Sequence, residues 1–187
     1  MRRPSTLASV GLGAALAVLT MADEARADMS SWYSVQGGYA KLRWTEPPVF
    51  ERSRYTMPID TGLGAPPSWA VIPGVGARLT PYFGQGTDWS LYARVMNRGY
   101  LTGGFGAALD GGAYVRAFGA GSSGYMGTLT LGLPWGIIAS GTYATGSHDA
   151  TTTSVGIGID FARLTVYRLS LEQQWPNVRP AWRPGDP

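Results

Sequence analysis

The chain has 187 residues and no cysteine, so disulfide bonds cannot stabilise it. Charged residues make up only 14% of the sequence, against about 25% in soluble domains, and the 27 glycines are about twice the usual share. The formal net charge of +3 is small and dispersed, which excludes the basic surface of a nucleic-acid-binding protein. This composition favours a β-sheet with much apolar surface.

The first 27 residues have the layout of a cleavable signal peptide. Arg2 and Arg3 give a positively charged start, residues 7–22 are uncharged and largely apolar, and Ala25-Arg26-Ala27 matches the small-x-small pattern of a cleavage site. The alternative is an anchor helix, but the apolar run is shorter than the roughly 20 residues that span a bilayer. We therefore expect export, with cleavage after Ala27.

After residue 27 the dominant pattern is an alternation with period two, typical of β-strands with two different faces. The predicted strands, in chain order, are 32–44, 70–79, 88–98, 102–110, 112–119, 124–133, 135–144, 152–161 and 163–174. In 124–133, for example, Leu129 and Leu131 share one face, and Thr128 and Thr130 share the other.

The aliphatic face of these strands has two possible environments. A soluble barrel or sandwich turns it inward, whereas a membrane barrel turns it toward lipid and the polar face toward the lumen. Three features favour the membrane. Lys41 is the one lysine of the chain, aromatic residues lie toward strand ends, and strands of about ten residues match an apolar band of ~25 Å. We therefore predict an all-β fold, an up-and-down antiparallel closed β-barrel that crosses a membrane.

The connections and the strand number complete this prediction. Tight turns are expected at 110–112, 134–136 and 160–163, and longer polar links at 97–103, 119–124 and 145–152, so that short turns occupy one rim and long loops the other. Because single-chain bacterial barrels have an even number of strands, we expect eight, or ten if 49–57 adds a strand to the Pro-rich loop 45–69. The barrel domain then covers 28–175, followed by a Pro-rich tail, 176–187.

Two sets of side chains are candidates for specific roles. Charged residues on the predicted inward face would form a salt-bridged filling of the lumen, or else an anion-favouring passage or small-ligand pocket. These are Arg78, Arg94, Arg98, Arg116, Arg168, Asp110, Asp160 and Glu172. The second set, on the aliphatic face, would form aromatic girdles at the two membrane interfaces. These are Tyr33, Tyr39, Trp89, Phe105, Tyr125, Tyr143, Phe161 and Tyr167.

With its leader and period-two strands, the chain resembles the small outer-membrane β-barrel proteins of the OmpA/OmpX kind over about residues 32–175. The resemblance is one of pattern and implies outer-membrane lipid and the barrel assembly machinery as partners. Tyr167, Leu169, Leu171 and Trp175 are similar to the terminal signal that this machinery recognises, although Gln173 interrupts the alternation and residues 176–187 follow.

Catalytic chemistry has little support in the sequence. Ser147, His148 and Asp149 are adjacent, whereas catalytic triads converge from separate parts of a chain. Some lipid-modifying barrels carry a His and a Ser near one rim, but Ala150 stands where the His-x-Ser spacing would need the serine. A single histidine and no cysteine predict no metal and no cofactor.

The leading hypothesis is therefore a non-enzymatic outer-membrane barrel with a structural or surface-interaction role. One alternative is a soluble secreted or periplasmic lipocalin-like barrel that binds an apolar ligand. A second is a lipid-modifying barrel enzyme that uses the His148 loop.

Overall fold

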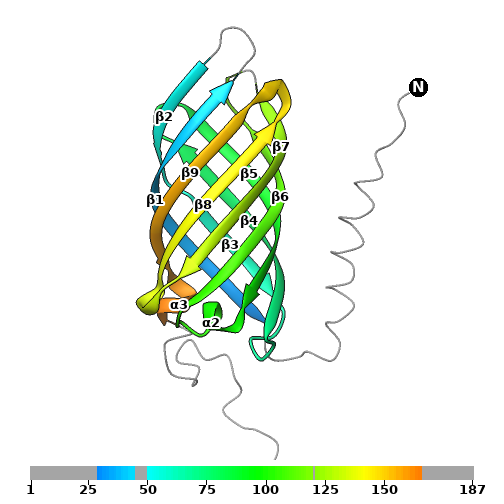
Figure 1. Ribbon diagram of the computed structural model, residues 1–187, viewed down its shortest axis with the longest axis vertical. Helices are drawn as coiled ribbons and strands as arrows, with labels where there is room; N and C mark the ends of the chain where they lie inside the picture. Colours follow the sequence, from blue (N-terminus) through cyan, green and yellow to red (C-terminus); the bar gives the residue numbers. More distant parts are fainter. Residues whose placement is uncertain (1–28, 45–49, 120, 166–187) are drawn as a thin grey trace, which may run out of the picture.

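The computed structural model describes residues 29–44, 50–119 and 121–165, which form one antiparallel β-sheet with short helical turns (Figure 1). The strands are β1 (Ser30–Trp44), β2 (Phe50–Thr56), β3 (Ile59–Gly64), β4 (Val71–Tyr82), β5 (Gly86–Asn97), β6 (Gly106–Arg116), β7 (Ser122–Gly132), β8 (Ile137–Gly146) and β9 (Thr151–Asp160). The helical turns are α2 (Arg98–Leu101), η2 (Pro134–Gly136), η3 (Ser147–Asp149) and α3 (Phe161–Thr165).

The hydrogen bonds of this sheet run in a complete ring. From β3 to β9 each strand pairs with the next, while β1 pairs with β9 on one side and with β2 and β3 on the other. The register of β1 with β2, in which Gly38 faces Thr56, continues unchanged into β3, where Val35 faces Ile59. Pro58 separates β2 from β3 because it has no backbone N–H to give to the ladder. β2 and β3 therefore fill one place in the ring, and the nine strands occupy eight places.

The strands are tilted because the ring is staggered. Following cross-strand partners once around from Tyr33 leads back to β1 at Arg43, ten residues further along. A stagger of ten residues over eight places corresponds to a tilt of roughly 40°, as in small barrels. Strands of 10 to 12 residues, such as β8 and β4, then span about 25–30 Å along the axis of the ring.

The aliphatic face points away from the axis, as predicted. Leu129, Leu131, Ile157 and Ile159 are 49%, 48%, 62% and 41% exposed, whereas Thr130, between the two leucines in the sequence, is 1% exposed. The sealed aliphatic interior that a soluble lipocalin-like barrel needs is therefore not formed by these side chains.

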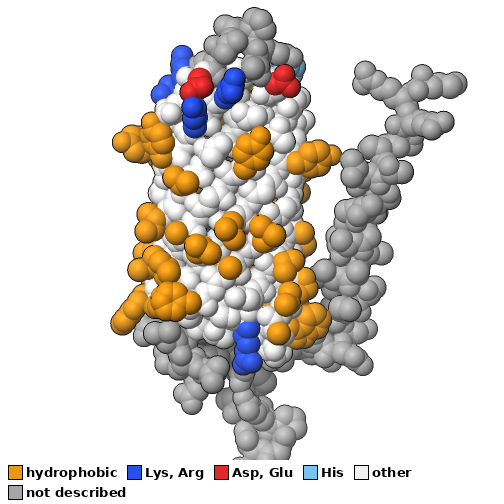
Figure 2. Space-filling view, in the orientation of Figure 1, with side chains coloured by type: hydrophobic (Ala, Val, Ile, Leu, Met, Phe, Trp, Pro, Cys, Tyr) orange, Lys and Arg blue, Asp and Glu red, His pale blue; other side chains and the backbone are white. Residues whose placement is uncertain are grey.

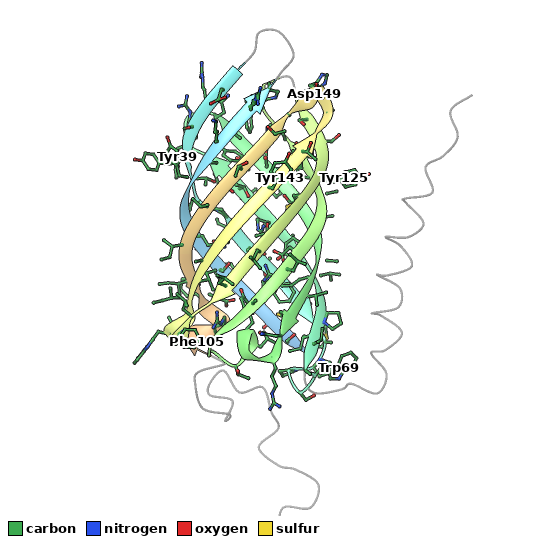
Figure 3. All side chains as sticks on the ribbon, viewed as in Figure 1. Tyr39, Trp69, Phe105, Tyr125, Tyr143 and Asp149 are labelled. Atoms are coloured by element: carbon green, nitrogen blue, oxygen red, sulfur yellow. The ribbon has the colours of Figure 1, made fainter. Side chains whose placement is uncertain are left out.

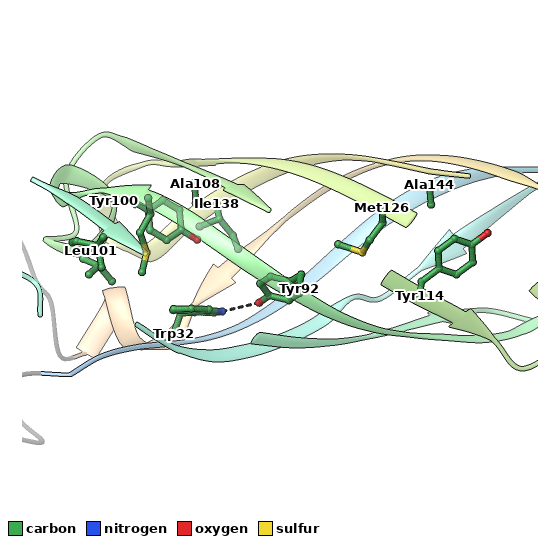
Figure 4. Close-up of a cluster of buried hydrophobic side chains, with 11 residues drawn as sticks. Trp32, Tyr92, Tyr100, Leu101, Ala108, Tyr114, Met126, Ile138 and Ala144 are labelled. Carbon is green, nitrogen blue, oxygen red and sulfur yellow. Dashed lines mark hydrogen bonds between the residues drawn. The ribbon is translucent and has the colours of Figure 1, made fainter. Parts of the chain in front are cut away.

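Inward glycines make room for large rings inside the closed sheet. Trp32 is 1% exposed, and its indole N–H donates to the Tyr92 hydroxyl at 2.8 Å (Figure 4). A Cβ added at Gly62 would overlap the Trp32 ring, and one added at Gly76 would overlap the Tyr92 phenol. The high glycine content thus reflects how closely the walls approach the aromatic filling.

Apolar side chains close one end of the ring. We call it the lower end, where Figure 1 shows α2 and α3 side by side below the strands. Tyr100 and Leu101 of α2 are buried in one cluster with Ile72, Met96 and Ile138. The last three are apolar residues on a face predicted to be polar, and their burial at 0–1% exposure explains why they interrupt its polarity.

Three of the predicted segments are assigned wrongly. Segment 110–112 is no turn but the middle of β6, where Gly111 pairs with both Ala93 and Gly127. The predicted loop 45–69 contains β2 and β3. Residues 161–165 form α3 rather than a strand because the Asp160 carboxylate accepts the N–H groups of Ala162 and Arg163 and so caps a helical turn. The rest of the predicted strand 163–174 lies outside the described residues, as do 1–27 and 176–187.

The predicted rim asymmetry is wrong for the same reason. The false turn at 110–112 placed 97–103 and 134–136 at opposite ends, whereas both lie at the lower end. Lower connections have six, eight and four residues (β3–β4, β5–β6, β7–β8), and the upper ones have five, three, five and four (β1–β2, β4–β5, β6–β7, β8–β9). The sheet has nine strands, not the predicted eight or ten, because β2 and β3 are separate strands that share one place in the ring.

We expect Gly62→Ala to lower the free energy of unfolding by about 1–3 kcal/mol, because the added methyl group collides with the buried Trp32 ring. Gly111→Ala is the matched control, since a Cβ at this outward position meets no atom within 4 Å. Urea unfolding followed by tryptophan fluorescence compares the two variants. Equal stabilities would mean that the Trp32 ring is not packed against β3.

Candidate functional site

The outer wall carries an apolar band between two belts of aromatic rings. The band consists of outward aliphatic side chains that are 41–72% exposed. They are Leu63, Val75, Leu91, Val95, Leu109, Leu129, Leu131, Val155, Ile157 and Ile159. In Figure 3, Tyr39, Tyr143 and Tyr125 lie in a row toward the upper end, and Phe105 and Trp69 lie at the lower end.

A pair of rings connects two neighbouring elements in each belt. In the upper belt, the Tyr39 and Tyr55 ring centroids are 5.6 Å apart, and Trp89 lies near the upper end of β5. In the lower belt, Tyr33 and Phe161 are 5.7 Å apart. The seven described girdle residues are 42–75% exposed, namely Tyr33, Tyr39, Trp89, Phe105, Tyr125, Tyr143 and Phe161. Tyr167 lies outside the described residues.

Three belt residues were not predicted from the sequence. Tyr55, Trp69 and Trp135 are 72%, 44% and 74% exposed, but they stand in segments predicted to be loop or turn. The alternation around Tyr55 was visible in 49–57 as the optional extra strand. Trp69 and Trp135 lie in connections, where period two gives no signal.

Exposed charges of the described residues are confined to the two ends of the ring. Figure 2 shows Lys and Arg side chains gathered at the upper rim, above the upper row of hydrophobic side chains. The exposed charged residues of the upper rim are Lys41, Arg43, Glu51, Arg52 and Asp149. At the lower end it is Arg98. The band itself therefore has no exposed charge among the residues that the structure describes.

Inside the ring, four charged side chains form one cluster, the central cluster, near the middle of the strands. Arg94 binds Asp110 through two parallel hydrogen bonds, Nε to Oδ1 at 2.6 Å and Nη2 to Oδ2 at 2.8 Å. Asp60 Oδ2 accepts from Arg94 at 2.8 Å and from Arg78 at 3.1 Å, and Arg78 also reaches Asp110 at 2.7 Å. All four are at most 4% exposed. Two carboxylates thus neutralise two guanidinium groups.

Hydroxyl groups and aromatic rings complete the surroundings of the central cluster. The Tyr92 hydroxyl donates to Asp60 Oδ1, and Arg78 donates to Thr128 Oγ1 at 2.6 Å. The Arg94 guanidinium carbon lies 4.6 Å from the Trp32 ring centroid. Positive charge over an aromatic face is favourable, particularly where water is excluded.

A second ion pair lies toward the upper end. Arg116 binds Asp88 through Nε to Oδ1 at 2.8 Å and Nη2 to Oδ2 at 2.7 Å, and it also donates to Thr152 at 2.7 Å. The Tyr82 hydroxyl donates to Asp88 at 3.0 Å. Four rings surround the guanidinium with centroids 5.1–5.7 Å from its carbon, those of Trp44, Tyr82, Tyr114 and Phe118.

Arg163 links the lower connections to one another. Its Nη2 donates to the carbonyl oxygens of Gly104 at 2.6 Å and Leu133 at 3.0 Å, and its guanidinium lies over the Tyr100 ring at 4.7 Å. Burial lowers the pKa of the Arg163 guanidinium below its usual value and raises the pKa of the Tyr100 phenol. Tyr100 therefore stays neutral beside the cation.

The eight predicted inward charges have four different outcomes. Arg78, Arg94, Arg116 and Asp110 belong to the two ion-pair groups, and Asp160 is buried but caps α3. Arg98 is exposed, contrary to the prediction. Asn97 caps α2 through its side chain, and the helical turn ends the alternation one residue before Arg98. Arg168 and Glu172 lie outside the described residues.

Three inward charges were not predicted from the sequence. Asp60 lies in the segment predicted to be loop, and Arg163 in the segment predicted to be strand. Asp88 opens a predicted strand, on the same face as Arg94, so the alternation could have identified it.

Between the central cluster and the Arg116–Asp88 pair lies a cavity of about 30 Å³. Arg78, Asp88, Ser90 and Thr142 are among the residues that line it. This volume holds one or two water molecules, which need roughly 10–15 Å³ each. It is too small for an organic ligand.

The His148 loop is an exposed turn at the upper rim. Ser147 Oγ accepts the N–H of Ser123 at 3.2 Å, so this hydroxyl serves the β7–η3 contact. His148 and Asp149 have positive φ, the left-handed backbone of a tight turn. In residues 29–44, 50–119 and 121–165, no three His, Cys, Asp or Glu side chains are grouped as metal ligands.

Comparison with known proteins gives no relative from which to transfer a function. No protein-family model, curated protein or solved structure matches this chain. Over the described part of the chain, no helix has the length and apolar character to cross a membrane. Only the surface and the interior of the sheet therefore bear on the function of this chain.

Replacing Asp110 by Asn should lower the free energy of unfolding by about 3–5 kcal/mol, because it leaves Arg78 and Arg94 buried with one carboxylate between them. Glu51→Gln is the control, since it breaks the exposed Lys41–Glu51 pair and should change stability little. Equilibrium urea unfolding measures both. Equal effects of the two variants would contradict a role for the central cluster in stability.

Proposed function

We propose that this protein is an outer-membrane β-barrel without catalytic activity, whose filled interior is a structural support and whose upper rim meets its partners. Outer-membrane lipid surrounds the apolar band, and the barrel assembly machinery inserts the chain. The signal-peptide layout of residues 1–27 supports export as the first step.

One observation carries this proposal, namely that the apolar band is exposed between two aromatic belts. Leu91, Val155, Ile157 and Leu109 are 72%, 63%, 62% and 62% exposed, far more than such residues in a soluble core. An exposed apolar surface larger than a few hundred Å² is unusual for a soluble monomer. Hydrocarbon removes that cost, and a strand height of about 25–30 Å suits the ~25 Å apolar band of membrane barrels.

The interior favours a filled structural support over a passage. Its buried charges balance, with Arg78, Arg94, Arg116 and Arg163 against Asp60, Asp88, Asp110 and Asp160. Eight places in a ring enclose little more than their own side chains. A cavity of only about 30 Å³ and the apolar cluster at the lower end of the described ring support a filled interior over a conducting one.

Neither alternative has a comparable observation in its favour. A soluble lipocalin-like barrel would need its aliphatic side chains around a cavity, and the outward Leu129 and Ile157 do not support it. A lipid-modifying enzyme would need the Ser147 hydroxyl near His148, and its contact with Ser123 gives that arrangement no support.

The first test is the mobility of the protein on a gel in SDS before and after boiling. We expect the unboiled protein to migrate differently from the boiled one, because a ring without a free edge resists SDS until heat opens it. The same protein should stay with the membranes when native envelopes are washed in buffer. Identical mobility, or release into buffer without detergent, would overturn the proposal.

A second test places a charge on the band. Ile157→Arg should make folding into phosphatidylcholine vesicles less favourable by about 2–4 kcal/mol. Thr153→Arg, on the same face of β9 but nearer the rim, should make it less favourable by only about 0–1 kcal/mol. Urea titration of the vesicle-bound protein gives both values. Equal, small costs would mean that Ile157 does not face hydrocarbon.

A further inference from the structure

The outer face of the upper rim has a patch that differs from the band below it. Lys41 and Arg43 point outward from β1, and outward hydroxyl side chains stand beside them on the paired strands. We call this set the rim patch: Lys41, Arg43, Ser53, Thr145, Thr151 and Thr153. Cross-strand pairing brings it together, because Lys41 faces Ser53 and Thr153, while Arg43 faces Thr151.

Positive charge dominates this part of the rim. Lys41 and Arg43 share the outer face with Glu51, and Arg52 and Arg54 stand on the other face of the same hairpin. Among the described residues of β1 and β2 there are thus four cations and one anion (Figure 2). The Lys41–Glu51 pair, with N and O 2.6 Å apart, has side chains 57% and 51% exposed. Exposed pairs of this kind are weak, so another anion can compete for Lys41.

The rim patch lies directly above the upper belt. Tyr39 and Tyr55 come two residues below Lys41 and Ser53 on the same faces, and Tyr143 pairs with Thr153. Along the outer face of β9 the chemistry changes once, from Thr151 and Thr153 to Val155, Ile157 and Ile159, and the change occurs where Val155 faces Tyr39. A cationic, hydroxyl-rich surface thus continues into an aliphatic one across a line of tyrosines.

We infer that the rim patch binds the phosphate-bearing headgroup of an anionic lipid, whose acyl chains lie along Val155 and Ile157. Arginine donates in pairs to phosphate oxygens, lysine adds charge, and the threonine and serine hydroxyls add donors. Each Lys or Arg near an anionic membrane surface strengthens binding about fivefold. At the lower end, the exposed cation among the described residues is Arg98, so this recognition belongs to one leaflet. The inference rests on the proposed function.

The test uses the full chain folded in zwitterionic detergent, with phosphatidylglycerol or phosphatidylcholine of identical acyl chains as the probe. Native mass spectrometry counts bound lipid. We expect phosphatidylglycerol to be preferred, and the Lys41→Gln/Arg43→Gln double variant to bind it roughly tenfold more weakly, since Glu51 already offsets part of the charge. Glu51→Gln should bind it more tightly. Arg98→Gln, the matched loss of an exposed cation at the other end, should bind it as the parent does.

Three results would overturn the inference. The first is a parent protein that shows no preference for phosphatidylglycerol. The second is a double variant that keeps the preference. The third is displacement of bound phosphatidylglycerol by inorganic phosphate as effectively as by further phosphatidylglycerol. The gel-mobility shift separates this failure from failure of the proposed function. If the shift persists in the parent and the double variant, only the lipid site is lost, whereas a parent without the shift removes the membrane barrel as well.

Discussion

Closure of the sheet creates an interior in which each buried charge needs polar or oppositely charged partners close to it. Eight buried charged side chains, four arginines and four aspartates, stand inside the described part of the ring. An unpaired charge there would cost several kcal/mol, so each carboxylate of the central cluster accepts from two guanidinium groups. Arginine suits this role better than lysine because its planar fork binds two oxygens at once, as Arg94 and Arg116 do with Asp110 and Asp88.

The same constraint explains why aromatic rings and glycines alternate on the inner wall. Carboxylates occupy only part of each guanidinium, and ring faces of Trp32, Tyr92 and Tyr114 surround the remainder. Rings of this size fit inside eight places only where the paired residue on the neighbouring strand has no side chain, as Gly62 beside Trp32 and Gly76 beside Tyr92. Charge, ring and glycine therefore form one packing unit.

Alternation in the sequence was sufficient to predict which side of each regular strand faces out. It identified the outward Leu129 and Ile157 because a strand with two different environments must alternate. The alternation failed as a guide where a strand ends early, is interrupted by proline or contains adjacent glycines. Asn97 begins a helical turn and so displaces Arg98, Pro58 conceals a strand broken in two, and the Gly111–Gly112 pair mimics a turn within β6. Asp60 was missed with the concealed strand, and it is one of the two carboxylates of the central cluster.

The two ends of the molecule differ in chemistry, and this difference limits where function can reside. Leu101 and Ile138 close the lower end with apolar packing, and Arg163 ties its connections together through backbone carbonyls. At the upper end, cations and hydroxyls stand on the outer face. In the described part of the ring, the central cluster fills the middle and apolar side chains fill the lower end. If the upper rim binds a partner, as we propose, it does so through its own outer surface, and the charge-balanced interior holds that surface in place.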